Sequence, residues 1–307
     1  MDSIHDLKRS ITPGAPVIID IAINGERTRD MNPNVPISAD EIAEEAIACL
    51  DAGASMIHAH NTNTTLTARE GAEDYMKTWR QVLKVRPDAL WYPTLVLDND
   101  PSQSGVEHVE ILVHELGLSI GCIDPGSVNI GTHIIDGDPA GILHNVSLDR
   151  ISKQCLLYRQ LGIGAAMGIY EPGYLRTALA YYRAGKLPKG SSLNLYFIDE
   201  YGLLSTDGAC SCGFPPQPKY LDVYLSLMEG YDIPWFVSVW GRNNKDSRQL
   251  LERALSMGGH IQVGLETHYD PDRKPTNIEL LKEIIAMAKD AGRPVATSSQ
   301  ARKILDL

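Results

Sequence analysis

The stretch "SADEIAEEAIACLDAGASMIHAH" (38–60) predicts one helix followed by one buried strand. Ser38 and Glu41 have the spacing of a capping box, in which each side chain bonds the backbone N–H of the other residue. The apolar stripe of the helix consists of Ile42, Ala46, Ile47 and Leu50. Gly53 ends this pattern, and the short apolar run that follows it is typical of a strand. The unit is therefore a helix–strand pair.

This unit recurs along the whole chain. Short apolar runs that predict strands covered on both faces lie at 17–23, 55–60, 91–97, 119–124, 164–170, 192–199, 233–240 and 260–266. Helical patterns alternate with them near 38–53, 69–85, 103–116, 147–161, 173–185, 216–230, 245–257 and 277–291. Eight such pairs predict an α/β fold, a (β/α)8 TIM barrel. No linker-like change in composition interrupts them, so we expect residues 1–307 to form a single domain.

An open, doubly wound sheet is the alternative fold. It predicts a glycine-rich phosphate-binding turn after the first strand, and "NGERTRDMNPNVP" (24–36) is not such a turn. Two connections, 125–146 and 200–215, are longer than usual for a barrel. Long connections after strands are often lids or interface elements.

Composition excludes several classes of protein. The 307 residues are 43% hydrophobic and 22% charged with a net charge of -11, which disfavours nucleic acid and anionic membrane surfaces as partners. No apolar run approaches the roughly 18 residues of a membrane helix. The first residues lack the apolar core of a signal peptide. We therefore expect a cytoplasmic protein, and we interpret Cys49, Cys122 and Cys155 as reduced core residues. Cys210 and Cys212 have a spacing closer to that of a metal or redox site, but they lie in a loop rich in glycine and proline, which favours a structural role.

Two histidines lie at the end of the second predicted strand. His58 and His60 are two residues apart, so both side chains point to the same side of the strand. In a barrel that side is the carboxyl-terminal mouth, where Glu266 ends strand eight. Two imidazoles and a carboxylate suit a divalent transition metal with open positions, most often zinc. The alternative is that one histidine is a core residue and that Glu266 caps a helix or pairs with an arginine.

Further candidates follow the other strands. The predicted strand-end side chains are Glu26, Thr94, Asp124, Ser127, Glu171, Asp199, Trp240, Arg242 and Thr267. Asp199 could act as a base or begin a solvated loop, and Arg242 could bind a substrate carboxylate or an outer ion pair. Glu26 could instead pair with Arg27 or Arg29 in a lid. The remaining histidines are interpreted as surface or loop residues, namely His5, His108, His114, His133, His144 and His260.

Several motifs together resemble the β-keto acid cleavage enzymes, whose type member is 3-keto-5-aminohexanoate cleavage enzyme. The resemblance runs nearly from end to end. The motifs that carry it are "DMNPNVPISADEIAEEAIACLDAGASMIHAH" (30–60), "DPGSVN" (124–129), "VWGRN" (239–243), "ALSMGGHIQVGLE" (254–266) and "AGRPVAT" (291–297). Singly these motifs are weak evidence, but their combination is specific.

The resemblance implies a zinc-dependent enzyme on a (β/α)8 barrel. Its metal ligands would be His58, His60 and Glu266. The implied reaction is a retro-Claisen exchange, in which a β-keto acid and acetyl-CoA give acetoacetate and a new acyl-CoA. Glu26 is similar to a family glutamate after strand one, while Thr94 and Ser127 lie near family positions that contact the substrate. A homo-oligomer, dimer or tetramer, is also implied.

The chain departs from the family at strand eight. The family pattern Arg-Val-Gly-Leu-Glu-Asp is Gln262 to Thr267 here, so Gln262 and Thr267 replace an arginine and an aspartate base. Glutamine carries no charge, and threonine is not a base at neutral pH. The residues that could substitute are Arg242, Asp124, Glu171 and Asp199. Two alternatives remain open: a different metal-dependent lyase or hydrolase, or a metal-bound protein without catalysis.

Aromatic residues also lie near the strand ends. Tyr92, Tyr170 and Trp240 are expected beside several carboxylates, a combination that suits a cationic group such as a quaternary amine. The alternative, that they are packing residues of the barrel or of a lid, is at least as compatible with the sequence.

Overall fold

The computed structural model describes residues 14–96, 104–205, 207–242 and 244–307. Eight parallel strands form one sheet in the order β3-β2-β1-β10-β9-β8-β7-β4, which confirms the predicted barrel. These strands are β1 (Ile19–Ala22), β2 (Met56–Ala59), β3 (Trp91–Pro93), β4 (Ile120–Ile123), β7 (Gly164–Ile169), β8 (Ser192–Ile198), β9 (Trp235–Trp240) and β10 (His260–Val263). β3 and β4 stand at the two ends of this order, and they lie in contact. Within the described residues no hydrogen-bonded ladder joins them, so the barrel is nearly closed.

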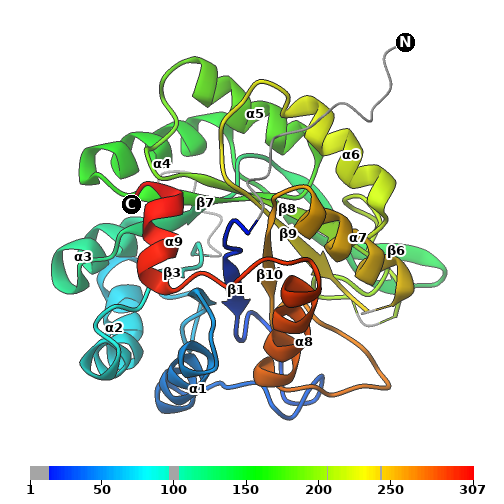
Figure 1. Ribbon diagram of the computed structural model, residues 1–307, viewed down its shortest axis with the longest axis horizontal. Helices are drawn as coiled ribbons and strands as arrows, with labels where there is room; N and C mark the ends of the chain where they lie inside the picture. Colours follow the sequence, from blue (N-terminus) through cyan, green and yellow to red (C-terminus); the bar gives the residue numbers. More distant parts are fainter. Residues whose placement is uncertain (1–13, 97–103, 206, 243) are drawn as a thin grey trace.

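Helices surround this barrel in Figure 1, which shows β1 near the centre. They are α1 (Ala39–Asp51), α2 (Ala68–Val85), α3 (Glu107–Leu116), α4 (Leu148–Leu161), α5 (Pro172–Arg183), α6 (Pro218–Leu227), α7 (Lys245–Ser256) and α8 (Asn277–Asp290). The capping box predicted for α1 is present, because the Ser38 side chain accepts from Glu41 N and the Glu41 side chain accepts from Ser38 N. The eight predicted strands and eight predicted helices are thus all present, in the predicted order. Residues 97 and 103, which the prediction included, lie outside the described part of the chain.

The core lies between the sheet and the helices. Strand residues such as Ile19, Ile57 and Val237 are fully buried, and they pack against helix residues such as Ala46 and Leu250. Parallel strands buried on both faces explain why the sequence shows continuous apolar runs rather than alternation. The pairing register places Ala22 opposite His58, so the ends of β1 and β2 meet at the same edge.

One long connection contains a β-hairpin. Strands β5 (Val128–Ile135) and β6 (Asp138–His144) pair antiparallel around the turn Asp136-Gly137. Asp136 and Gly137 both have positive φ, 51° and 93°, as a two-residue hairpin turn requires. The hairpin, labelled at β6, extends to the edge of the molecule in Figure 1. The sequence pattern predicted only a long connection here, without strands.

A ninth helix, α9 (Ser298–Leu305), was also missed. Thr297 and Gln300 form a capping box at its start. The helix lies at the amino-terminal end of the barrel, because Arg302 donates to Ala89 O before β3 and to Ser119 Oγ before β4. Among the described residues, no helix has the length and apolar character needed to cross a membrane.

Candidate active site

Three predicted ligands meet at the carboxyl-terminal mouth of the barrel. The ligand atoms of His58, His60 and Glu266 all lie within 4.8 Å of one another, and the three residues are buried. His58 Nε2 lies 3.3 Å from Glu266 Oε2, and His60 Nε2 lies 3.3 Å from Glu266 Oε1. Within the described residues, Glu266 Oε2 has no hydrogen-bond partner despite its burial. Nitrogen and oxygen donors that converge in this way could hold a metal ion.

The outer nitrogens of both imidazoles are already engaged. His58 Nδ1 lies 3.2 Å from Tyr92 O, and His60 Nδ1 lies 3.2 Å from Glu26 Oε1. When Nδ1 donates to these oxygens, the lone pair of the neutral ring is on Nε2, which faces Glu266. Carboxylate and carbonyl partners of this kind orient metal-binding histidines in many proteins. The donor set and its supporting contacts therefore fit a divalent transition metal.

Two residues after β1 shape this cluster. Asn24 accepts from His60 N at 2.9 Å and donates to His60 O at 3.1 Å, which ties the end of β1 to the end of β2. Gly25 has a φ of 58°, and a Cβ at this position would lie 2.3 Å from Glu266 Cγ. Only glycine leaves room for the Glu266 side chain here.

Electrostatics in the cluster favours charged side chains. Burial raises the pKa of Glu266, but the facing charges of His58 and His60 outweigh it and hold that pKa well below its usual range. Burial lowers the pKa of His60, whereas the charge of Glu266 and the bond to Glu26 raise it to about 9. A metal requires a neutral imidazole, so metal binding at this cluster is expected to release a proton.

A cavity of about 120 Å³ opens beside the cluster. Of the predicted site residues, those that line it are Glu26, His58, His60, Thr94, Asp124, Trp240 and Glu266. The other lining residues are Arg27, Leu95, Cys122, Ile130, Ile142, His144, Tyr170, Tyr196, Leu203 and Leu204. Ile130 and Ile142 belong to the hairpin, and Leu203 belongs to the 200–215 connection. Both long connections therefore cover the cavity.

The remaining predicted residues lie outside this lining. Asp199 Oδ2 accepts from Arg242 N at 2.9 Å, and Arg242 also reaches Glu200 at 3.2 Å, so this arginine is held in ion pairs. Glu171 Oε1 accepts from Gly213 N at 2.9 Å. Ser127 Oγ accepts from Val146 N at 2.9 Å, at the base of the hairpin.

Gln262 and Thr267, the two strand-eight residues that depart from the resembled pattern, also lie outside the cavity lining. Gln262 Nε2 donates to Asp20 Oδ2 at 2.9 Å and to Tyr92 OH at 2.8 Å, in a polar layer inside the barrel. Thr267 is buried, and its hydroxyl lies 3.3 Å from Gly264 O. Tyr92 belongs to the same polar layer, since its hydroxyl donates to Asp20 at 2.6 Å.

Two cavity residues, His144 and Arg27, were misread. His144 was interpreted as a surface residue, but its Nε2 lies 2.9 Å from Asp124 Oδ2 in the cavity. His108 and His260, also predicted at the surface, are buried at 1% and 6% exposure, while His5 lies outside the described residues. Arg27 was considered only as an ion-pair partner in a lid. The turn signal Asp136-Gly137 could have revealed the hairpin, and with it His144.

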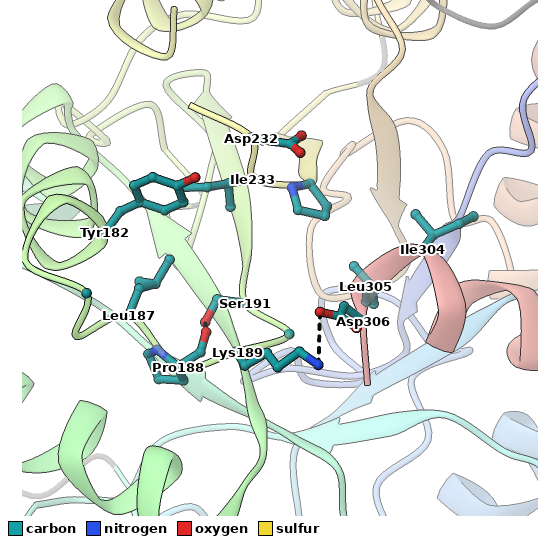
Figure 2. A pocket seen from close by; sticks show the side chains of 13 residues that line it. Tyr182, Leu187, Pro188, Lys189, Ser191, Asp232, Ile233, Ile304, Leu305 and Asp306 are labelled. Carbon is teal, nitrogen blue, oxygen red and sulfur yellow. Dashed lines mark hydrogen bonds and ion pairs between the residues drawn. The ribbon is translucent and has the colours of Figure 1, made fainter. Parts of the chain in front are cut away.

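Larger cavities lie elsewhere. One of about 450 Å³ is shown in Figure 2 and lies at the amino-terminal end, between the start of β8 and the end of α9. Lys189 and Asp306 form an ion pair across it at 3.2 Å, and both side chains are exposed. Because chemistry in barrels occurs at the carboxyl ends of the strands, the smaller cavity beside Glu266 is the candidate site.

Comparison with protein families matches residues 16–307 to the beta-keto acid cleavage enzyme model. The match includes all three candidate metal ligands. This chain belongs to that family. The polar layer formed by Gln262 and the lack of an acidic residue at Thr267 are therefore features of one member of the β-keto acid cleavage enzyme family.

Two characterised relatives match along nearly their full length. The 3-keto-5-aminohexanoate cleavage enzyme of Fusobacterium nucleatum is 28% identical over 95% of this chain and 98% of its own. The 3-oxoadipate:acetyl-CoA acetyltransferase of Cupriavidus necator is 27% identical over 95% of each chain. The names of these relatives describe keto acids with different tails, one bearing an amine and one bearing a second carboxylate.

A solved structure with the same fold is ObcA in a ternary complex with a C4-CoA adduct and oxalate. It superposes with a TM-score of 0.65 over 90% of this chain and 68% of that chain, at 16% identity. At this identity the likeness concerns the fold.

Proposed function

We propose that the protein is a metal-dependent β-keto acid cleavage enzyme that exchanges acyl groups with acetyl-CoA. The observation that carries this proposal is the convergence of His58 Nε2, His60 Nε2 and the Glu266 carboxylate beside a small cavity. In the reaction, the bond between C2 and C3 of the β-keto acid breaks. The acyl group passes to the sulfur of CoA, and the acetyl group of acetyl-CoA joins C2 to give acetoacetate.

The proposed metal is zinc or another divalent transition ion held by His58, His60 and Glu266. When bound, it would act as a Lewis acid at the substrate oxygens. Glu26 lies at the cavity and bonds His60 Nδ1, which lowers the pKa of its carboxyl. This keeps Glu26 ionised and able to accept a proton from the substrate. Asp124, whose Oδ2 lies 2.9 Å from His144 Nε2, is a second carboxylate in the cavity lining.

A different metal-dependent lyase or hydrolase on the same barrel is the second candidate. The observation that favours it is that Gln262 and Thr267 stand where the family pattern has an arginine and an aspartate. Neither residue lines the cavity. Such an enzyme would act without CoA. The two candidates therefore differ in one measurable requirement.

The test is a panel of β-keto acids incubated with zinc-loaded protein, with and without acetyl-CoA, followed by mass spectrometry of the products. The acyl exchange predicts acetoacetate and a new acyl-CoA that appear only when acetyl-CoA is present. Glu266→Gln should abolish both metal retention and product formation, because it removes a charged ligand. Products that form equally without CoA would support the lyase or hydrolase instead.

The far wall of the cavity suggests the class of keto acid. Tyr170 and Tyr196 have ring centroids 4.9 Å apart, and Tyr196 and Trp240 have centroids 5.1 Å apart. All three rings line the cavity with the Asp124 carboxylate. We infer that this wall accepts a cationic tail, because inclined aromatic faces and a carboxylate both attract cations.

Replacing Trp240 with Leu tests the cationic tail. The change keeps an apolar wall but removes the best cation-binding ring. It should reduce kcat/KM for keto acids with a quaternary amine more than for neutral keto acids of equal length. An unchanged preference between the two would reject this substrate class without affecting the proposed reaction.

The remaining expectations stay predictions for the same protein. Acetyl-CoA is proposed as the co-substrate, and the assembly is proposed to be a homo-oligomer. Exposed apolar side chains on the hairpin, Ile135 at 53% and Leu143 at 58%, would suit contacts between copies. A cytoplasmic location is also proposed, and the five free cysteines agree with it.

A further inference from the structure

Arg27 is a buried cation in the wall of the cavity. Its residue exposure is 5%, and it lies in the turn that follows β1. Its Nε donates to Glu266 O at 3.0 Å, which fixes the guanidinium beside a metal ligand. Its carbon Cζ lies 5.7 Å from the ring centroid of Tyr269. These contacts orient the side chain without neutralising it.

The guanidinium of Arg27 is incompletely bonded. Within the described residues, Nη2 is buried without any hydrogen-bond partner. Nη1 has only a weak acceptor, Met31 Sδ at 3.9 Å. Among the described residues, no carboxylate oxygen lies within 4.0 Å of a guanidinium nitrogen of Arg27, so the side chain forms no ion pair with them. Burial of a charge without a partner is costly, so such a group indicates that a ligand supplies the missing acceptor.

The other arginine considered for this role is not free. Arg242 is bonded to Asp199 and Glu200, its side chain is 40% exposed, and it does not line the cavity. Gln262, at the position of the family arginine, is bonded to Asp20 and Tyr92 in the layer inside the barrel. Among the described residues, Arg27 is therefore the arginine that lines the cavity.

We propose that Arg27 binds the carboxylate of the β-keto acid through Nη2 and supplies the positive charge that Gln262 lacks. This assignment rests on the proposed function. A carboxylate beside Glu266 would complete the bonding of Arg27 and would lie next to the metal ligands. A phosphate of CoA is a poorer match, because a cavity of about 120 Å³ holds only a small acid.

Protonation is compatible with this role. A guanidinium stays protonated in proteins. The side chain is thus charged at neutral pH and can form charge-assisted bonds to an anion.

The test uses acetoacetate and its uncharged analogue methyl acetoacetate as probes of zinc-loaded protein, with binding measured by calorimetry. The variant is Arg27→Met, which keeps an unbranched apolar stem and removes the guanidinium. The matched control is Arg29→Met, two residues away on the same turn, where the guanidinium is exposed and paired with Glu41. Zinc content and melting temperature are measured for each protein, so that lost metal or lost folding is detected.

Arg27→Met should weaken acetoacetate binding about 10- to 100-fold, the factor expected for a lost charge-assisted hydrogen bond. Binding of methyl acetoacetate should change less than about threefold, because this probe has no charge to lose a partner. Arg29→Met should leave both affinities unchanged. Equal weakening of both probes would reject the assignment, since it would show that Arg27 only supports the Glu266 backbone.

A second variant covers the case in which Arg27→Met fails to fold or to retain zinc. Arg27→Lys keeps the charge but loses the guanidinium fork, and it should bind acetoacetate with intermediate affinity and retain preference over the methyl ester. Loss of that preference in Arg27→Lys, with zinc retained, would overturn the role of charge. If the wild-type protein binds no acetoacetate, the proposed function itself fails. If wild type binds it and Arg27→Met binds it equally, only the assignment of Arg27 fails.

Discussion

Asp20 is a carboxyl group in the polar layer inside the barrel. It is 1% exposed and accepts from Tyr92 OH at 2.6 Å and from Gln262 Nε2 at 2.9 Å. Its second oxygen, Oδ1, has no partner among the described residues. Burial raises the pKa of Asp20 from 3.8 to about 6, although the bonds from Tyr92 and Gln262 oppose this shift. An ionised Asp20 therefore lowers the stability of the folded protein.

The replacement Asp20→Asn should remove this pH dependence. Folded Asp20 keeps a proton that the unfolded chain releases, so the free energy of unfolding falls as pH rises through the range from about 4 to 6. The free energy of unfolding of Asp20→Asn, relative to that of wild type, should therefore rise by about 1 kcal/mol from pH 5 to pH 8. The measurement is chemical denaturation of metal-free protein at both values.

The control is Glu70→Gln, an exposed acidic position at the start of α2. This variant measures the effect of removing one exposed carboxylate. A difference between Asp20→Asn and wild type that is the same at both pH values would mean that Asp20 titrates normally in the folded protein.

At the scale of elements, the hairpin β5–β6 determines how the cavity is covered. Ser127 fixes its base, because Oγ accepts from Val146 N at 2.9 Å and donates to Val146 O at 3.1 Å. Ile142 and His144, on the returning strand, then line the cavity. The Ser127 hydroxyl therefore contributes to the position of these two side chains, together with the β5–β6 ladder.

Ser127→Ala should loosen the hairpin. The change leaves the buried Val146 N–H unsatisfied, at a cost of about 1–3 kcal/mol. Amide hydrogen exchange at 128–144 should become faster, and KM for the keto acid should rise, with zinc content unchanged. Ser226→Ala, which removes an exposed bond to Val223 O, serves as the control. A higher KM with unchanged exchange would instead indicate that Ser127 contacts the substrate directly.

The elements show why sequence predicted some parts of the site and not others. His58 and His60 were predictable because strand geometry alone places residues i and i+2 on one side. Asn24 and Arg27 were not, because their roles depend on contacts with His60 and Glu266 across the barrel mouth. His144 required recognition of the hairpin turn.

At the scale of the whole molecule, the repeated helix–strand pattern was sufficient to predict the barrel. It could not predict how the barrel closes, because closure depends on contacts between segments distant in sequence. Helix α9 makes such contacts: Arg302 Nη1 donates to Ser119 Oγ at 2.6 Å and Nη2 donates to Ala89 O at 3.1 Å. These two residues precede β4 and β3, the outer strands that no ladder joins within the described residues. Arg302 therefore bridges the incomplete junction of the barrel.

Arg302→Met should separate stability from function. In barrels the amino-terminal face contributes stability and the carboxyl-terminal face contributes chemistry. The loss of two bonds at the β3–β4 junction should lower the free energy of unfolding by about 1–3 kcal/mol. Zinc content and acetoacetate affinity should remain those of wild type, because Arg302 lies at the end opposite to Glu266.

Arg27→Met provides the matched comparison, since it removes the same group at the other end of the barrel. It should weaken acetoacetate binding, while any loss of stability is offset by removal of a buried unpaired charge. Denaturation and calorimetry on the two variants would measure both quantities side by side. The cavity residues Thr94 and Asp124 directly follow β3 and β4. A fall in acetoacetate affinity for Arg302→Met would therefore contradict the separation of stability from function, because it would show that closure of the β3–β4 junction also positions these two residues.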